Sequence, residues 1–254
     1  MSSAETHRPR MSRRATFLMT VGSLLTLAIL LALGTWQVNR LAWKEELIAT
    51  IEERVTAEPR PLTDIETRHA TTRDVDYWPI AVSGTFHHAG ERHYLATWRG
   101  NSGFHVITPL ELADGRFLFV NRGFVPYDRK NPATRPEGQI EGEMEIVGLS
   151  RAAEYEKPSF IVPDNDPAKN VFYWKDIEQM ADSAGLADAT VLPFLVDAGD
   201  AANPGGLPVG GVTRIEMPNN HLQYAVTWYG LALTLVLVAG AWLWRNRGTS
   251  DRGS

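Results

Sequence analysis

The sequence contains no cysteine. No disulfide can therefore stabilise a domain of this chain, and no thiolate is available to bind zinc, copper or an iron–sulfur cluster or to attach haem covalently. Stability must come from the burial of apolar side chains. The central part of the chain, about 180 residues, is long enough for this, because a domain of that size buries roughly 70% of its unfolded surface.

The sequence also lacks the motifs of common enzyme classes. It has no Gly-x-Ser-x-Gly motif, no phosphate-binding loop and no dinucleotide-binding fingerprint. One group of potential metal ligands comprises His87, His88, Glu91 and His93. Adjacent residues of a strand point to opposite faces, however, and no metal motif of fixed spacing is present. We therefore expect neither a resident metal ion nor catalytic activity.

Charged residues are absent from two long runs, residues 15–39 and 222–244. A hydrocarbon core about 30 Å thick is crossed by a helix of roughly 20 apolar residues, so each run is long enough to span a membrane. We predict membrane helices over residues 15–38 and 219–244. A cleaved signal peptide is an alternative for the first run, but the apolar part is longer than the roughly 7 to 15 residues that are usual there.

The charge of the flanking segments predicts the orientation of both helices. Residues 1–14 and 245–254 are short and basic, and 28 of the 30 Asp and Glu residues lie between the two runs. By the positive-inside rule both tails are expected in the cytoplasm and the acidic middle outside it, which argues against nucleic acid as a partner. The bacterial inner membrane, with a periplasmic domain, is the simplest location. The mitochondrial inner membrane is less favoured, because a presequence would have to fit into residues 1–14.

Helical periodicity continues beyond the first run and predicts a helical extension over residues 39–58. Large side chains recur there at helical spacing, at Trp36, Arg40, Trp43 and Leu47. Pro59 is expected to end this helix. The two tryptophans are typical of interfacial anchors. The alternative is a ridge that binds a partner protein, consisting of Trp36, Arg40, Trp43 and Lys44.

Period-two alternation replaces helical periodicity in the central segment, residues 59–218. Strands are predicted over residues 80–86, 94–98, 104–112, 117–125, 140–149, 192–196 and 213–217. Asp114 and Gly115 between two of these strands predict a hairpin. The only helix expected in this segment covers residues 171–184. The predicted fold is two transmembrane helices flanking an α+β, mainly antiparallel β, extracytoplasmic domain that forms a curled sheet or open barrel.

Two short motifs lie at the ends of predicted elements. Asn121, Arg122 and Gly123 close a strand, where glycine permits unusual backbone angles. In the simplest interpretation, Arg122 pairs with a surface acid. At the start of the second membrane helix, Asn219 or Asn220 is a good N-cap. The residues that follow on one helical face include His221, Tyr224 and Trp228.

The chain closely resembles the Surfeit locus protein 1 family of cytochrome c oxidase assembly factors in three runs, LGTWQVNRLAWKEELI at 33–48, VNRGFVP at 120–126 and NNHLQYAVTWYGLA at 219–232. Phe124 stands where many members are expected to have tryptophan. The resemblance implies a membrane-anchored, non-enzymatic factor that promotes maturation of the haem a-containing oxidase core. Its implied partners are the oxidase catalytic subunit, other oxidase assembly factors and membrane lipid, and its implied cofactor, suggested for bacterial members, is haem a.

Haem a leads to a specific prediction for the second motif. Without cysteine, a haem near the bilayer needs a His, Met or Tyr ligand, and His221 is the only histidine adjoining either uncharged run. We predict that His221 is an axial ligand; a solvated interfacial histidine is the alternative. The residues expected to line the site are Tyr224 and Trp228, and those expected to contact the propionates are Arg40 or Arg122. The residues assigned to partner binding are Trp36, Arg40, Trp43, Lys44, Asn121, Gly123, Asn219 and Asn220.

Two other functions are alternatives to an assembly factor. The first is a two-span periplasmic binding or sensor module, but a sensor would need a cytoplasmic output, and the two tails are too short to supply one. The second is an enzyme that modifies haem. That chemistry inside a bilayer would need several buried histidines, and only His221 lies near a predicted span.

Overall fold

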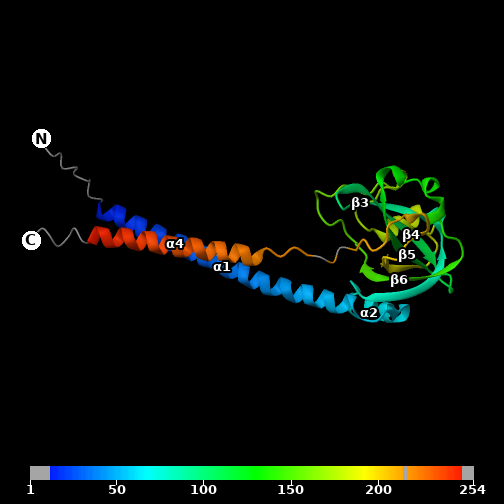
Figure 1. Ribbon diagram of the computed structural model, residues 1–254, viewed down its shortest axis with the longest axis horizontal. Helices are drawn as coiled ribbons and strands as arrows, with labels where there is room; N and C mark the ends of the chain where they lie inside the picture. The colour runs from blue at the N-terminus through cyan, green and yellow to red at the C-terminus, as the bar shows by residue number, and fades with distance from the viewer. Residues whose placement is uncertain (1–11, 214, 216, 248–254) are drawn as a thin grey trace, which may run out of the picture. The chain divides into compact units, whose positions relative to one another are not determined.

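A computed structural model describes residues 12–213, 215 and 217–247 of the chain (Figure 1). The chain divides into two compact units. One contains the two ends of the chain, up to Ala49 and from Glu216 onward, and the other contains Thr50–Ile215. Each unit has its own kind of secondary structure, helical in the first and mainly β in the second.

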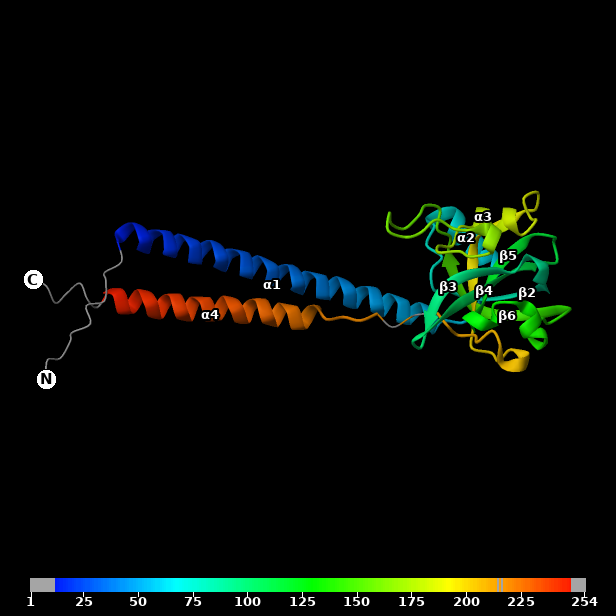
Figure 2. The same ribbon diagram turned by 90° about the horizontal axis from the view of Figure 1, so that it is seen from above.

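In the described residues of the terminal unit there are two helices, α1 (Arg13–Val55), which continues into the other unit, and α4 (His221–Arg247). Figures 1 and 2 show α4 running beside the N-terminal part of α1. Both helices are long and apolar enough to cross a membrane, and only 6% of the most apolar stretch of each is buried inside the protein. A core helix of a soluble protein would bury such a stretch, so these apolar surfaces need a membrane around them. The chain is therefore a membrane protein, as predicted.

Small side chains lie where α1 and α4 meet. Gly34 is packed so closely that a Cβ atom there would lie 2.9 Å from the Tyr229 ring, and the buried positions of α4 include Ala225 and Ala232. The hydroxyls of Thr35 and Tyr229 are 3.1 Å apart and hydrogen-bonded. Small residues and interhelical hydrogen bonds are the usual means of helix association in lipid, where the hydrophobic effect gives no drive.

Helix α1 ends at Val55, three residues before the predicted end of the extension. The Ala57 amide donates to the Arg54 carbonyl at 3.0 Å, which closes the last turn tightly. The residue before a proline is disfavoured in helical conformation, so the chain leaves the helix before it reaches Pro59. Pro59 also has no N–H to donate to the carbonyl of Val55, four residues earlier, so the helix cannot run through it.

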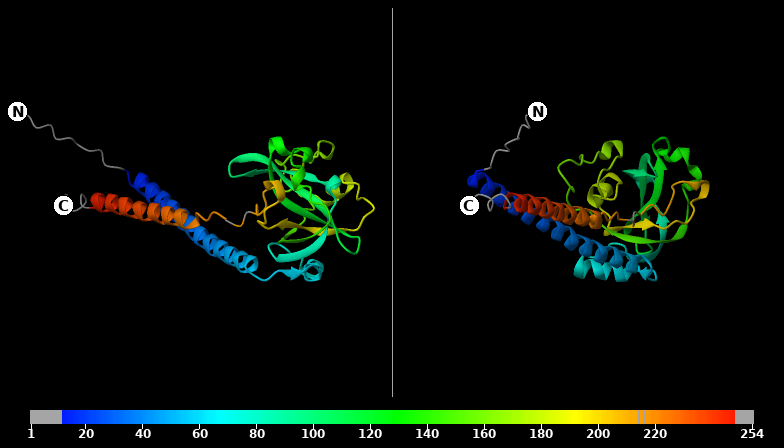
Figure 3. Two further views of the ribbon diagram at one scale, coloured as in Figure 1. Left: turned by 45° about the vertical axis from the view of Figure 1, so that its right-hand side comes forward. Right: turned by 60° about the vertical axis from the view of Figure 1, so that its left-hand side comes forward.

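The Thr50–Ile215 unit is a curled sheet. Its strands are β1 (Arg60–Pro61), β2 (Pro79–Phe86), β3 (Arg92–Trp98), β4 (Asn101–Glu111), β5 (Phe117–Pro126), β6 (Glu143–Ala152) and β7 (Val191–Ala198). They are arranged in the order β1-β2-β6-β7-β5-β4-β3, and a short β2–β4 pairing closes five of them into a partial barrel. Figure 3 shows this curl from two sides. Among the strands of the described part of the chain, only β1–β2 and β5–β7 pair in parallel, so the predicted mainly antiparallel β domain is confirmed.

Two helices accompany the sheet, α2 (Leu62–Thr72) and α3 (Ile177–Ser183). The prediction of a single helix over residues 171–184 was wrong in two respects. Helix α3 starts later, because the Asp176 side chain caps it by accepting from the Gln179 amide at 3.1 Å, while residues 171 and 172 form β-bridges. Helix α2 was not predicted. Its threonine-rich sequence has low helix propensity, and it is stabilised by packing, since Ile65 is fully buried.

Most predicted strands are present within a few residues, with two differences. The strand predicted over 140–149 begins at Glu143, and its alternation is as expected, with Glu143 and Glu145 exposed and Ile146 buried. The strand predicted over 213–217 is not formed at Thr213, Ile215 and Met217, whereas residues 214 and 216 lie outside the described part. Short 3-10 turns lie at His88–Gly90, Tyr127–Arg129, Pro132–Thr134, Pro136–Gly138, Pro167–Lys169 and Pro204–Gly206.

The apolar core fills both sides of the curled sheet. Inside the barrel one cluster joins β2, β4, β5, β6, β7 and α2, and its fully buried members include Ile65, Ile80, Leu110, Leu118, Val120, Phe194 and Val196. A second cluster packs α3 on the sheet and includes Ile107, Phe119, Phe172, Met180 and Leu195. These clusters hold the ends of the strands in fixed register, which positions the polar groups described below.

Candidate functional site

The first turn of α4 contacts α1 through one strong polar interaction. His221, the first residue of α4, places its Nδ1 atom 2.7 Å from Oε1 of Gln37. The Gln37 side chain is only 8% exposed, near the end of the uncharged run of α1. The two residues are 184 positions apart in the chain. We call Gln37, His221, Tyr224 and Trp228 the junction cluster, because they lie where both uncharged runs meet polar sequence.

The start of α4 is set by the two asparagines before it. The Asn219 Oδ1 atom accepts from the His221 amide at 3.4 Å, and the Tyr224 amide donates to the Asn220 carbonyl at 3.2 Å. A side-chain acceptor at this position satisfies an amide that has no partner within the helix. The capping role predicted for these asparagines is thus present at Asn219, and it fixes the backbone that carries His221.

The residues of the predicted aromatic face of α4 differ in how deeply they are buried. His221 and Trp228 are half-buried and Ala225 is buried, but Tyr224 is 54% exposed. The helical spacing places Ala225, one turn after His221, on the side that faces α1. Tyr224 therefore lies at the edge of the junction cluster rather than inside it.

The predicted ridge on α1 presents aromatic surface. Trp36 is 56% exposed and Trp43 is 47% exposed. The Arg40 guanidinium lies 3.8 Å from the centre of the Trp43 ring, a cation–π contact, and Nζ of Lys44 is 3.5 Å from Sδ of Met217. Exposed tryptophans suit either interpretation made from the sequence, anchoring at a membrane interface or contact with a partner.

Sequence reasoning did not single out Gln37, Thr35 or Tyr229. A signal was nevertheless present, because Thr35 and Gln37 are polar residues inside a predicted membrane span. Polar side chains there usually face another helix and bond to it. Both do so in the structure, Thr35 to Tyr229 and Gln37 to His221.

The motif in β5 lies inside the β unit. Asn121 is buried and donates to Oδ1 of Asp197 at 2.8 Å, while its own Oδ1 accepts from the Gly123 amide at 3.1 Å. Gly123 has a φ of 124°, and a Cβ atom there would collide with the carbonyl of Val209, which forms an antiparallel β-bridge with the next residue, Phe124. Only glycine fits both constraints. Neither Asn121 nor Gly123 is at the surface, so their predicted roles in partner binding stay predictions.

Arg122 is also an interior residue, with 2% of its surface exposed. Its Nη2 atom donates to the Gly138 carbonyl, and its guanidinium lies 4.6 Å from the centre of the Phe86 ring. Burial lowers the pKa of Arg122 to about 10, so it stays charged at neutral pH. Among the described residues, Arg122 forms no ion pair with a carboxylate. The prediction that it pairs with a surface acid was therefore wrong. Its predicted contact with a propionate stays a prediction.

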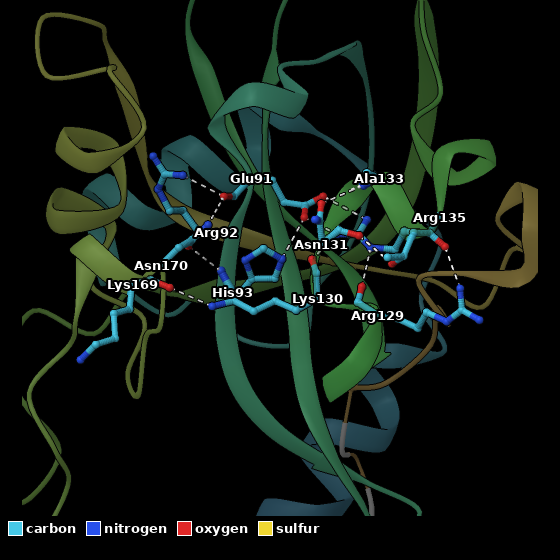
Figure 4. Close-up of polar contacts among 11 residues, drawn as sticks. Glu91, Arg92, His93, Arg129, Lys130, Asn131, Ala133, Arg135, Lys169 and Asn170 are labelled. Carbon is cyan, nitrogen blue, oxygen red and sulfur yellow. Dashed lines mark hydrogen bonds and ion pairs between the residues drawn. The ribbon is translucent and has the colours of Figure 1, made fainter.

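A buried ionic cluster holds the loop after β5. Figure 4 shows the Glu91 side chain directed toward Arg135 and His93. Arg135 donates to both carboxylate oxygens of Glu91, and Nε2 of His93 lies 2.9 Å from Oε1 of Glu91. Burial alone would raise the pKa of Glu91, but the hydrogen bonds from His93 and Arg135 and the charge of Arg135 hold it below its usual value. Arg135 also donates to the carbonyls of Arg129 and Lys130, which ties the loop down.

The histidines considered as metal ligands lie apart. His87 is exposed with its ring edge-on to Phe117, and Nε2 of His88 is 2.7 Å from the Ile140 carbonyl. His93 contacts Glu91, whose oxygens are already occupied by Arg135. Within the described residues, no group of three or more potential ligands gathers at one point.

A second buried network centres on Asp197 of β7. Its carboxylate accepts from Asn121 at 2.8 Å and from the Thr213 hydroxyl at 3.0 Å, with Lys175 at 3.6 Å and Arg151 at 3.8 Å. Burial would raise the pKa of Asp197, and the charges of Lys175 and Arg151 outweigh this and lower it. The network joins β5 and β7 to the segment that leads toward α4.

Comparisons with known proteins agree with this arrangement. A model described as the SURF1 family matches residues 24–233 of the chain. Surfeit locus protein 1 of Xenopus tropicalis is 41% identical over 230 residues, which cover 84% of this chain and 70% of that protein. The human protein of the same name is 39% identical over 229 residues, covering 84% and 71%. That of Takifugu rubripes is 38% identical over 225 residues, covering 82% and 90%.

Proposed function

Because the chain belongs to the SURF1 family, we propose that it is a membrane-anchored, non-enzymatic assembly factor for a haem a-containing cytochrome c oxidase. The resemblance in the three sequence runs supports this role, and two membrane helices supply the anchor. Its proposed partners are the oxidase catalytic subunit, other oxidase assembly factors and membrane lipid. Its proposed place is a bacterial inner membrane, with both basic tails in the cytoplasm and the β unit in the periplasm.

The observation that carries the proposal is the contact between His221 and Gln37 at the start of α4. The assembly role proposed here is to assist the insertion of haem a into the catalytic subunit or to stabilise that subunit, and His221 is the residue that would hold the haem iron. When bound, the group would supply an iron centre that takes one imidazole nitrogen. His221 can offer one, since its other ring nitrogen is already engaged by Gln37.

The neighbouring residues also fit a tetrapyrrole. Trp228 is half-buried and Tyr224 exposed, so α4 offers aromatic surface on the side that carries His221. Arg40 follows Gln37 by three residues on α1, about 4.5 Å further along the helix axis in the direction away from the predicted membrane span. An arginine there suits a carboxylate that remains near water while the ring system enters the bilayer. We therefore propose Arg40, rather than the buried Arg122, as the propionate contact.

The test is an optical spectrum of the full chain purified in detergent from cells that make haem a. Wild-type protein is expected to carry a haem Soret band, and His221→Ala is expected to lose or shift it. His87→Ala is the matched control, because His87 is an exposed histidine of the β unit. If His221→Ala, present at normal level, binds haem a with an unchanged spectrum and stoichiometry, the ligand assignment is wrong.

A periplasmic binding module without catalytic activity is the second candidate. The observation that favours it is a cavity of about 570 Å³ beside α3, lined by Ile177, Ala181 and Leu186 and by acidic residues such as Glu154 and Glu178. The two functions differ in a deletion strain. Loss of assembled oxidase, restored by the wild-type gene, supports the assembly factor, whereas normal oxidase content supports the binding module.

A further inference from the structure

We propose that Gln37 is a positioning residue, which fixes the tautomer and the ring orientation of His221 so that Nε2 is the nitrogen available to a metal-containing ligand. This inference rests on the proposed function, because it concerns the same site. The structure shows the contact directly, with His221 Nδ1 and Gln37 Oε1 2.7 Å apart. Gln37 itself does not touch the ligand; it acts through His221.

The chemistry of the two groups decides the tautomer. An amide oxygen only accepts hydrogen bonds, so the short contact requires Nδ1 of His221 to carry the proton. A neutral imidazole has one protonated nitrogen, and Nε2 is then left with a free lone pair. Histidines that ligate metals commonly donate their other ring N–H to a fixed acceptor, which raises the basicity of the ligating nitrogen.

The surroundings make this acceptor a fixed one. Gln37 is 8% exposed although it lies near the end of the uncharged run of α1, so its amide is shielded from water and hydrogen-bonds to His221. The His221 backbone is held independently by the Asn219 cap. The imidazole is therefore restrained at both ends, by the capped backbone and by the amide.

A separate bond holds the same two helices together nearby. The hydroxyls of Thr35 and Tyr229 are hydrogen-bonded at 3.1 Å, and this bond shares no residue with the bond between Gln37 and His221. The two interhelical bonds can therefore be removed one at a time. A loss caused by weaker helix pairing would follow removal of either bond, whereas a loss of positioning would follow removal of the Gln37 bond alone.

The experiment titrates the full chain in detergent with haem a extracted from a purified oxidase, and it measures the dissociation constant and the reduction midpoint potential. Three variants are compared with wild type, namely Gln37→Leu, Gln37→Glu and Thr35→Val. Leucine removes the acceptor. An ionised glutamate offers only acceptors and has no proton to donate, so it can hold only the tautomer with the proton on Nδ1.

We expect Gln37→Leu to weaken haem a binding about 10- to 100-fold, as is typical when the hydrogen-bond partner of a metal-ligating histidine is lost. Its midpoint potential should become more positive, because a less basic imidazole stabilises the ferric state less. Gln37→Glu should bind nearly as tightly as wild type, with a more negative potential. Thr35→Val should leave both quantities unchanged.

Unchanged affinity and potential in Gln37→Leu would overturn the inference, and so would an equal loss in Thr35→Val. The failure of the proposed function is distinguishable from either result. If His221→Ala keeps its haem, the site itself is misassigned. If His221→Ala loses haem while Gln37→Leu behaves as wild type, only the positioning role is wrong.

Discussion

Replacing Glu91 by glutamine should destabilise the β unit severely. The Glu91 carboxylate is buried, accepts from Arg135 with both oxygens and lies 2.9 Å from His93 Nε2. Glutamine removes the negative charge and leaves the Arg135 cation buried without a counter-ion. Removing one partner of a buried ion pair costs about 3–5 kcal/mol, because the remaining charge stays desolvated. For a domain of about 150–250 residues, each kcal/mol lowers Tm by about 2–4 °C, so the expected loss is about 6–20 °C.

The assay is thermal unfolding of the full chain in detergent, followed by tryptophan fluorescence. Asp164→Asn is the matched control, because Asp164 pairs with Lys157 at 2.7 Å but its side chain is 91% exposed. A surface pair contributes little, so this control should shift Tm by less than about 4 °C. A loss for Glu91→Gln no larger than for Asp164→Asn would refute the reasoning that the burial of this cluster determines its energetic weight.

Three further predictions use other parts of the chain. Trp43→Ala should lower the amount of assembled oxidase, because truncating an aromatic anchor of an interface commonly costs about 2 kcal/mol, roughly thirtyfold in affinity. The control Trp244→Ala should leave the amount of oxidase unchanged. Equal oxidase content in the two variants, at normal protein level, would leave Trp43 only a role as a membrane anchor. A reporter active only outside the cytoplasm should work when fused after Pro126 and fail after Trp244, and activity at the second fusion would contradict the topology. Burial, with the charge of Lys175, lowers the pKa of His105 from 6.5 to about 4, so the unfolded state binds the proton more readily. The contribution of neutral His105 to the free energy of unfolding is fully present above pH 6.5, and about 3 kcal/mol of it is lost as the pH falls toward 4. His105→Phe should therefore flatten this part of a plot of Tm against pH. An unchanged slope in the variant would disprove the prediction.

The sequence by itself determined the features that depend on short stretches of chain. Two uncharged runs predicted two membrane helices, and both are present as α1 and α4. Alternation predicted most strands, as in β6, where Glu143 and Glu145 are exposed on one face. These patterns are readable because the periods of helix and strand repeat within a few residues. The Asn219 cap was predictable for the same reason, since it acts two residues away on His221.

The tertiary structure alone decided which polar residues meet. Gln37 and His221 are 184 residues apart, so no local pattern could pair them. The burial of Arg122 was equally hidden, because both faces of β5 are covered in the fold, and the elements that cover a strand do not follow from the sequence of that strand. Helix α2 was missed because its propensity is weak and its stability comes from the burial of Ile65 in a core built by distant strands. Contacts between segments far apart in the chain depend on how the helices and the sheet pack together, and this packing is determined by all of these elements at once.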